Sequence, residues 1–71
     1  MNTVVMVEWL DITASEYKTM LTRWHSTGFL LHRNKMVKGI PCVVIAQSWT
    51  GSKYTERLTI PEAVVVSVKE V

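Results

Sequence analysis

The sequence lacks what a disulfide-stabilised domain requires. Only one cysteine occurs in its 71 residues, so no disulfide can form within the chain. Cys42 lies in an apolar run, residues 42–46, where a thiol behaves as a small buried hydrophobe. We therefore expect Cys42 to be buried, and an unpaired buried cysteine is typical of a reducing compartment. The cysteine content predicts a cytoplasmic protein.

Long apolar runs are also missing. No stretch approaches the roughly 18 consecutive apolar residues that a membrane span needs. The apolar run near the N-terminus is interrupted by Glu8 and has no basic segment before it, so we expect no signal peptide. Repeats and linker-like segments are absent, and a chain of this length can bury one core. A single domain over residues 1–71 is expected.

Motifs for catalysis, cofactors and metals are missing too. Cys42, His25 and Asp11 can be written down as a nucleophile set, and Cys42 with His25 and His32 as a zinc site. The close C-x-x-C or H-x-x-x-H spacings that support such sites do not occur. No glycine-rich phosphate loop is present, and the six acids are scattered singly. We expect a protein that is not an enzyme and has no cofactor and no metal.

The sequence does have an uneven distribution of charge. The formal net charge is only +2, but no acidic residue lies between Glu16 and Glu56. That segment contains six basic residues and both histidines: Lys18, Arg23, His25, His32, Arg33, Lys35, Lys38 and Lys53. If folding brings them onto one face, that face attracts an anionic partner, such as a nucleotide, a nucleic acid or an acidic protein surface. The alternative is a solvated surface without a partner.

The first third of the chain predicts a strand and then a helix. Residues 4–12 are rich in β-branched and aromatic side chains, which favours a strand. Residues 13–16, Thr-Ala-Ser-Glu, have the form of a capping box that begins a helix. An apolar stripe follows at helical spacing: Tyr17, Met20, Leu21 and Trp24. A short helix is therefore predicted, ending near Gly28, which can adopt the left-handed conformation of a helix terminus.

The rest of the chain predicts four more strands, at residues 29–33, 41–49, 54–60 and 64–71. They are separated by a polar turn at 34–39, a hairpin loop at 50–53 and a turn at 61–63. In the last strand, Val64, Val66 and Val68 form the expected core face. Five strands in so short a chain hide their edges most economically by closing into a small barrel. An open sheet with the helix packed across one face is the alternative.

Several core and turn segments resemble small proteins encoded by bacteriophages. They are Trp9-Leu10-Asp11, Gly28-Phe29-Leu30-Leu31, Val43-Val44-Ile45-Ala46 and Leu58-Thr59-Ile60-Pro61. The Ile60-Pro61 turn before the last strand also resembles that of SH3-like and Sm-like barrels. The resemblance implies a small SH3-like or Sm-like barrel, from which this sequence departs in its helical segment after the first strand. The expected fold is therefore mainly β (α+β), a small five-stranded SH3-like or Sm-like barrel with one short helix after the first strand. No catalytic or binding motif comes with it.

The aromatic residues give a candidate ligand-binding surface. Trp24 lies on the predicted helix stripe, whereas Trp49 lies near a strand end with Tyr54 across the hairpin loop. Aromatic rings interleaved with basic residues are typical of nucleotide or single-strand binding. The candidate set is Arg33, Lys35, Lys53, Trp49, Tyr54 and His32. The alternative interpretation is a cross-strand aromatic pair that only stabilises the hairpin.

Three hypotheses for function follow. The leading one is a non-catalytic phage accessory protein of the anti-defence type, which binds and inhibits or sequesters a host factor or an anionic ligand. The second is a nucleic-acid-binding barrel, whose affinity would fall steeply with salt. The third is a structural or self-assembling protein, because three tryptophans and many valines exceed what so small a core can bury. A homo-oligomer is expected under all three.

Overall fold

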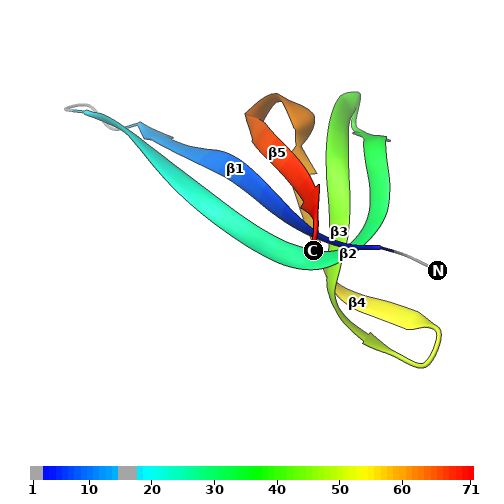
Figure 1. Ribbon diagram of the computed structural model, residues 1–71. Helices are drawn as coiled ribbons and strands as arrows, with labels where there is room; N and C mark the ends of the chain where they lie inside the picture. The colour runs from blue at the N-terminus through cyan, green and yellow to red at the C-terminus, as the bar shows by residue number, and fades with distance from the viewer. Residues whose placement is uncertain (1–2, 15–17) are drawn as a thin grey trace.

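The computed structural model describes residues 3–14 and 18–71 as one antiparallel sheet of five strands (Figure 1). The elements in chain order are β1 (Val4–Ala14), β2 (Thr19–Val37), β3 (Ile40–Thr50), β4 (Lys53–Pro61), the 3-10 helix η1 (Glu62–Val64) and β5 (Val65–Glu70). In the sheet the strand order is β4-β3-β2-β1-β5. The prediction of a mainly β fold with five strands is confirmed. Within these residues, no helix is both long and apolar enough to cross a membrane.

The predicted barrel is wrong, because the sheet is not closed. β4 and β5 lie at the two ends of the strand order, and no pairing joins them within the described chain. β5 has six residues and pairs only with Val5–Trp9 of β1. Instead of a closing strand pair, η1 packs near β1 and β3 at this end of the sheet.

The predicted helix after the first strand is also wrong, as is the alternative sheet with a helix across it. Met20, Leu21 and Trp24 lie in β2, opposite Thr13, Ile12 and Trp9 of β1. The ladder from Val4–Phe29 to Ala14–Thr19 provides long-range backbone pairing that the local helical spacing does not reveal. The β-branched threonines of this part of β2 also favour a strand: Thr19, Thr22 and Thr27. Ser15, Glu16 and Tyr17 of the predicted helix lie outside the described residues.

β2 is long and bent because it pairs with two different strands. Up to Phe29 it pairs with β1, and from Phe29 onward it pairs with β3. Its register to β3 shifts between Leu30 and His32 and again between His32 and Lys35. Asn34, inside the second shift, has a φ of 54°. Such bulges bend a strand and increase its twist. The predicted turn at 34–39 is therefore mostly strand, and the turn itself is confined to Lys38 and Gly39.

The distal half of the β1–β2 hairpin projects from the molecule (Figure 1). We call this part the arm, which comprises the described residues 10–14 and 18–24. We call the remainder the body. Beyond Trp9, β1 has no pairing with β5, and before Phe29, β2 has none with β3. The arm is thus a two-stranded ribbon.

Gly28 permits the backbones of β2 and β3 to pack closely against each other. It is buried, and a Cβ built on it would come within 2.5 Å of the carbonyl oxygen of Ala46 in β3. Any side chain at this position would collide with the β3 backbone. Gly28 thus allows two strands to approach, rather than ending a helix as the sequence predicted.

The core is small and lies in the body. Its buried residues are Val5, Val7, Val43, Ile45 and Ile60, and the side chains packed around them are Trp9, Leu30, Leu58, Val64, Val65 and Val68. Cys42 is also buried, as predicted, and its Sγ–H donates to the carbonyl oxygen of Ile40 at 3.3 Å.

The last strand follows its predicted pattern only in part. Val64 and Val68 pack against the core as expected, but Val66 is 47% exposed and Val65 packs inward in its place. The register between β1 and β5 shifts between Glu8 and Trp9, so that Trp9 is opposite Val65 and Glu8 is opposite Ser67. Val66 is the extra residue of this bulge. The simple alternation therefore fails there.

Candidate functional site: an aromatic cluster at the β3–β4 hairpin

The predicted hairpin between β3 and β4 forms, and it places Trp49 directly opposite Tyr54. The ring of Phe29 contacts both of these rings, so neither is held in place only by its cross-strand neighbour. The centroid of Phe29 lies 6.0 Å from that of Trp49, nearly perpendicular to it, and 5.7 Å from that of Tyr54. We call Phe29, Trp49 and Tyr54 the aromatic cluster. Edge-to-face pairs of this kind are favourable arrangements of aromatic rings.

Sequence reasoning found the pair of Trp49 and Tyr54 but missed Phe29. The short loop between β3 and β4 predicts which residues of that hairpin face each other. Phe29 comes from β2 and reaches the cluster through its pairing with Ala46 of β3. Its location depends on the bend and the register of β2, and no local signal in the sequence reports either.

The charges around the aromatic cluster are mixed, with a small positive excess. Lys53 is exposed at the hairpin end, paired with Thr50. Arg57 is opposite Ala46, which on its other side is opposite Phe29, so Arg57 and Phe29 flank Ala46 on one face. The carboxylate of Glu56 accepts a hydrogen bond from the Ser48 hydroxyl at 3.0 Å. The hairpin can therefore attract a negatively charged partner, but only weakly.

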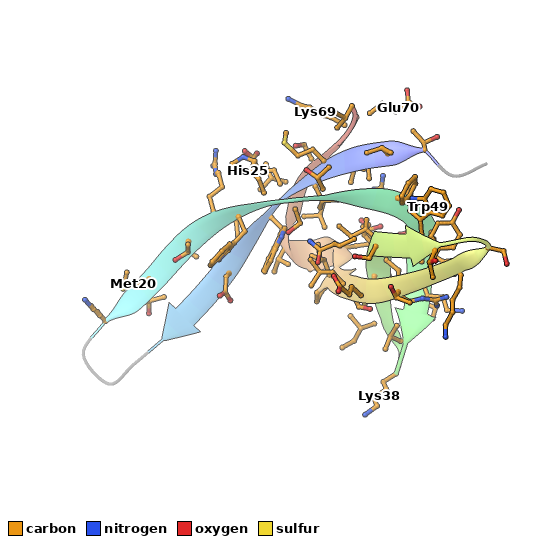
Figure 2. The ribbon with its side chains drawn as sticks, turned by 90° about the horizontal axis from the view of Figure 1, so that it is seen from below. Met20, His25, Lys38, Trp49, Lys69 and Glu70 are labelled. Carbon is orange, nitrogen blue, oxygen red and sulfur yellow. The ribbon has the colours of Figure 1, made fainter. Side chains whose placement is uncertain are left out.

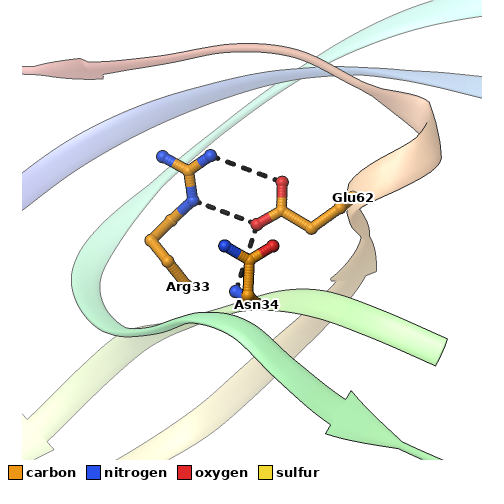
Figure 3. Close-up of polar contacts among 3 residues, drawn as sticks. All are labelled: Arg33, Asn34 and Glu62. Atoms are coloured by element: carbon orange, nitrogen blue, oxygen red, sulfur yellow. Dashed lines mark hydrogen bonds and ion pairs between the residues drawn. The ribbon is translucent and has the colours of Figure 1, made fainter. Parts of the chain in front are cut away.

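Arg33 is engaged in a different contact. Its guanidinium donates from Nε to Oε1 of Glu62 at 3.1 Å and from Nη2 to Oε2 at 3.3 Å (Figure 3). The backbone N–H of Asn34 also donates to this carboxylate, at 3.2 Å. The hydrogen bonds from Arg33 are the main cause that lowers the pKa of Glu62 below its usual value, against a smaller opposing effect of burial. Arg33 thus clamps the bulge of β2 to η1.

The other two predicted ligands lie toward the opposite end of β3. His32 is opposite Val44 and Lys35 is opposite Cys42, and both side chains are exposed. At 3.3 Å per residue, these positions are about 16 and 23 Å along β3 from Trp49. Of the six candidate residues, the structure brings together Trp49, Tyr54 and Lys53. It does not bring Arg33, Lys35 or His32 to them.

The basic residues of the middle segment do not gather on one face. Arg23 approaches Glu8 with an Nη1–Oε1 distance of 3.7 Å, and His25 Nε2 lies 3.1 Å from the same oxygen. Lys38 lies at the β2–β3 turn, remote from both the arm and Trp49 in Figure 2. The molecule is 47 Å long, and these cations are distributed along it. A broad basic surface is therefore not available to an anion.

A metal site needs several ligating side chains that converge on one ion. Over residues 3–14 and 18–71, no group of three or more His, Cys, Asp or Glu residues lies close enough together to bind one. No pocket forms in the same part of the molecule. The aromatic cluster is thus an open surface, where Trp49 is 56% exposed.

Comparison of the chain with protein family models, with curated proteins and with solved structures found no match in any of the three. The resemblance to phage-encoded proteins stays a prediction.

Proposed function

We propose that this protein is a small non-catalytic binding protein whose contact surface is the aromatic cluster. The observation that supports this most directly is Trp49, which is 56% exposed and yet held edge-to-face by Phe29. An exposed but ordered indole offers a large contact area and loses little side-chain freedom on binding. Tryptophan and tyrosine are also the side chains that most often dominate the energy of protein interfaces.

The partner that suits this surface is a protein with an acidic patch. Lys53 and Arg57 belong to the same hairpin, opposite Thr50 and Ala46, and cations near an interface steer an acidic partner and set its orientation. A ligand against Trp49 lies on the outer surface of the hairpin, so an extended partner gains more contact there than a small one. Such a protein would act by covering its partner, which is how an accessory protein inhibits or sequesters a host factor.

Single-stranded nucleic acid is the second candidate, favoured by the pair Trp49 and Tyr54 with Lys53 in the neighbouring pair of the same ladder. Stacking of a base on an aromatic ring contributes about 1–3 kcal/mol. With only Lys53 and Arg57 to contact phosphates, the logarithm of affinity should fall with the logarithm of salt with a slope of about −1.4. This shallow slope differs from that of a strongly basic nucleic-acid-binding domain.

The test compares Trp49→Ala with Met36→Ala, which removes a side chain of similar exposure, 59%, opposite Pro41 at the far end of β3 from Trp49. Partners captured from a bacterial lysate are identified by mass spectrometry, purified and titrated by calorimetry. A single-stranded oligonucleotide is titrated in parallel. We expect Trp49→Ala to weaken binding at least about tenfold, as loss of an interface anchor does, and Met36→Ala to leave it unchanged. Equal binding by the two variants contradicts the proposal.

A further inference from the structure

The accessible surface of the molecule is larger than that of a compact protein of the same mass. Its accessible surface is 5252 Å², whereas a compact protein of this mass exposes about 4,500 Å². Its radius of gyration is 13.4 Å, against about 11 Å for a compact chain of this length. The excess area, roughly 750 Å², is close to the 800 Å² that one partner contributes to a standard protein interface.

The arm accounts for this shape and exposes apolar side chains. Leu21 is 64% exposed, Trp24 50% and Met20 49%. Trp24 is covered on one side by the stacked ring of Trp9, 6.2 Å away between centroids. A two-stranded hairpin by itself is at best marginally stable in water. An arm of this length therefore gains stability from any surface that pairs with it or covers it.

The outer edge of β2, from the arm as far as Thr27, carries backbone groups with which no other described strand pairs. The N–H of Leu30 donates to the carbonyl of Thr3 at 2.8 Å, which identifies the pairs of β1 and β2 that exchange hydrogen bonds. By the alternation of an antiparallel ladder, the even-numbered residues of β2 from 20 to 28 bond to β1. The odd-numbered residues direct N–H and C=O groups outward: Leu21, Arg23, His25 and Thr27. β3 does not cover this edge, because its pairing begins at Phe29.

We propose that a second copy of this chain pairs with that edge. β2 of one copy lies antiparallel to β2 of the other around a twofold axis at Thr22, and the two arms form a four-stranded ribbon. In this register Leu21 and Arg23 of opposite copies exchange backbone hydrogen bonds. Met20 of each copy lies opposite Trp24 of the other, and a thioether against an aromatic ring is a favourable contact. A register centred on Arg23 would oppose two arginines.

The charges of the arm suit a second copy better than a partner with charge of one sign. Glu8 lies 3.7 Å from Arg23 and 3.1 Å from His25, so charges along this edge are compensated within each copy. A twofold interface brings the same surface of both copies together and therefore requires this kind of balance. Self-association also adds burial to a chain whose own core is small.

This pairing is independent of the proposed function. Met20 in the arm and Trp49 in the aromatic cluster lie at opposite ends of the molecule (Figure 2). The dimer leaves both aromatic clusters open. Loss of the dimer and loss of ligand binding can therefore be observed separately.

Sedimentation velocity over a range of concentrations tests the pairing with two variants at one position. Leu21→Pro removes an outward N–H and places a ring on the free edge, which edge strands tolerate in the monomer. Leu21→Thr removes the apolar side chain but keeps the N–H. We expect dimers from the wild type and from Leu21→Thr, and monomers from Leu21→Pro. A monomeric wild type, or an equal loss of dimer in both variants, overturns the proposal.

A crosslinking experiment tests the register without relying on the proline variant. Two Thr22→Cys copies would face each other with Cα atoms about 4.5 Å apart, within the range of disulfides. Asp11→Cys is the matched control, because Asp11 is exposed and opposite Thr22 in the arm. The two Asp11 positions would be about 14 Å apart, three strand spacings. Mild oxidation should crosslink Thr22→Cys and leave Asp11→Cys without a crosslink, since Cys42 is buried. Equal crosslinking of the two variants overturns the register.

Discussion

The body and the arm are built from the same two strands and yet bury their apolar residues to very different degrees. In the body, Val5 and Val7 of β1 are 3% and 0% exposed. In the arm, Leu21 and Trp24 of β2 are 64% and 50% exposed. β5 and β3 flank the hairpin in the body, whereas neither strand pairs with the described residues of the arm. Strand formation and burial are thus separate outcomes, and the second depends on neighbouring strands.

The comparison is tested most strongly by truncating one apolar side chain in each region. Ile45 has no exposed surface, so Ile45→Ala should lower the free energy of unfolding by about 2–5 kcal/mol through lost transfer energy and a cavity. Leu21→Ala in the arm should change it by less than about 0.5 kcal/mol under monomeric conditions. Urea denaturation followed by circular dichroism measures both. Similar losses would mean that the arm is packed as tightly as the body.

Gly28→Ala tests the junction between the two regions. The new Cβ would lie 2.5 Å from the Ala46 carbonyl oxygen, so β2 and β3 must separate. We expect a loss of about 1–3 kcal/mol in the free energy of unfolding. Thr27→Ala, at the exposed neighbouring position, is the control and should cost much less. An unchanged stability of Gly28→Ala would show that β2 does not cross β3 so closely.

Trp24→Ala tests whether the arm is ordered. It removes the ring stacked on Trp9, and such a pair contributes about 0.5–1.5 kcal/mol. Two coupled indoles also produce a strong near-ultraviolet circular dichroism signal, which should disappear in this variant. Trp49→Ala is the control, because it removes an indole that contacts Phe29 and not another tryptophan. If the signal persists in Trp24→Ala, the stacked pair does not form.

Glu62→Gln tests a contact confined to the body and should have the smallest effect. Arg33 is half exposed, so the expected loss at neutral pH is below about 1 kcal/mol. Because the pKa of Glu62 is lowered by folding, its ionised form stabilises the protein above the usual value of 4.5. That contribution disappears as pH falls through the lowered pKa.

Stability curves of the wild type and Glu62→Gln should therefore converge under acid conditions. Glu70→Gln, at an exposed position without an ion pair in the described residues, should show no such convergence. Parallel curves for the wild type and Glu62→Gln at all pH values would contradict the role of the Arg33 clamp.

Much of the fold was predictable where the signal is local. The strands near residues 4–12, 41–49 and 54–60 and the hairpin loop at 50–53 agree with the structure. The errors lie where pairing partners decide the outcome. The apolar spacing of Met20, Leu21 and Trp24 suits a helix, but β1 holds them in a strand. Val66 breaks its alternation because of a bulge with β1.

Of the candidate site, only the part that lies within the β3–β4 hairpin was predictable from the sequence. Trp49, Lys53 and Tyr54 lie close in sequence, and their short loop determines that they come together. Arg33, Lys35 and His32 were grouped with them by composition, but two bulges and the length of β3 carry them elsewhere. Phe29 joins the cluster only because β2 changes its pairing partner from β1 to β3 at this residue.

The sequence by itself determined that this chain forms strands, that the apolar run at residues 42–46 is buried, and that the β3–β4 hairpin pairs Trp49 with Tyr54. These outcomes follow from side-chain hydrophobicity and from the geometry of a short loop. The tertiary structure alone decided that β2 is one bent strand, that the sheet stays open and that Arg33 binds Glu62. Register and bulges between distant strands control those features, because each shift of one residue changes which side chains share a face.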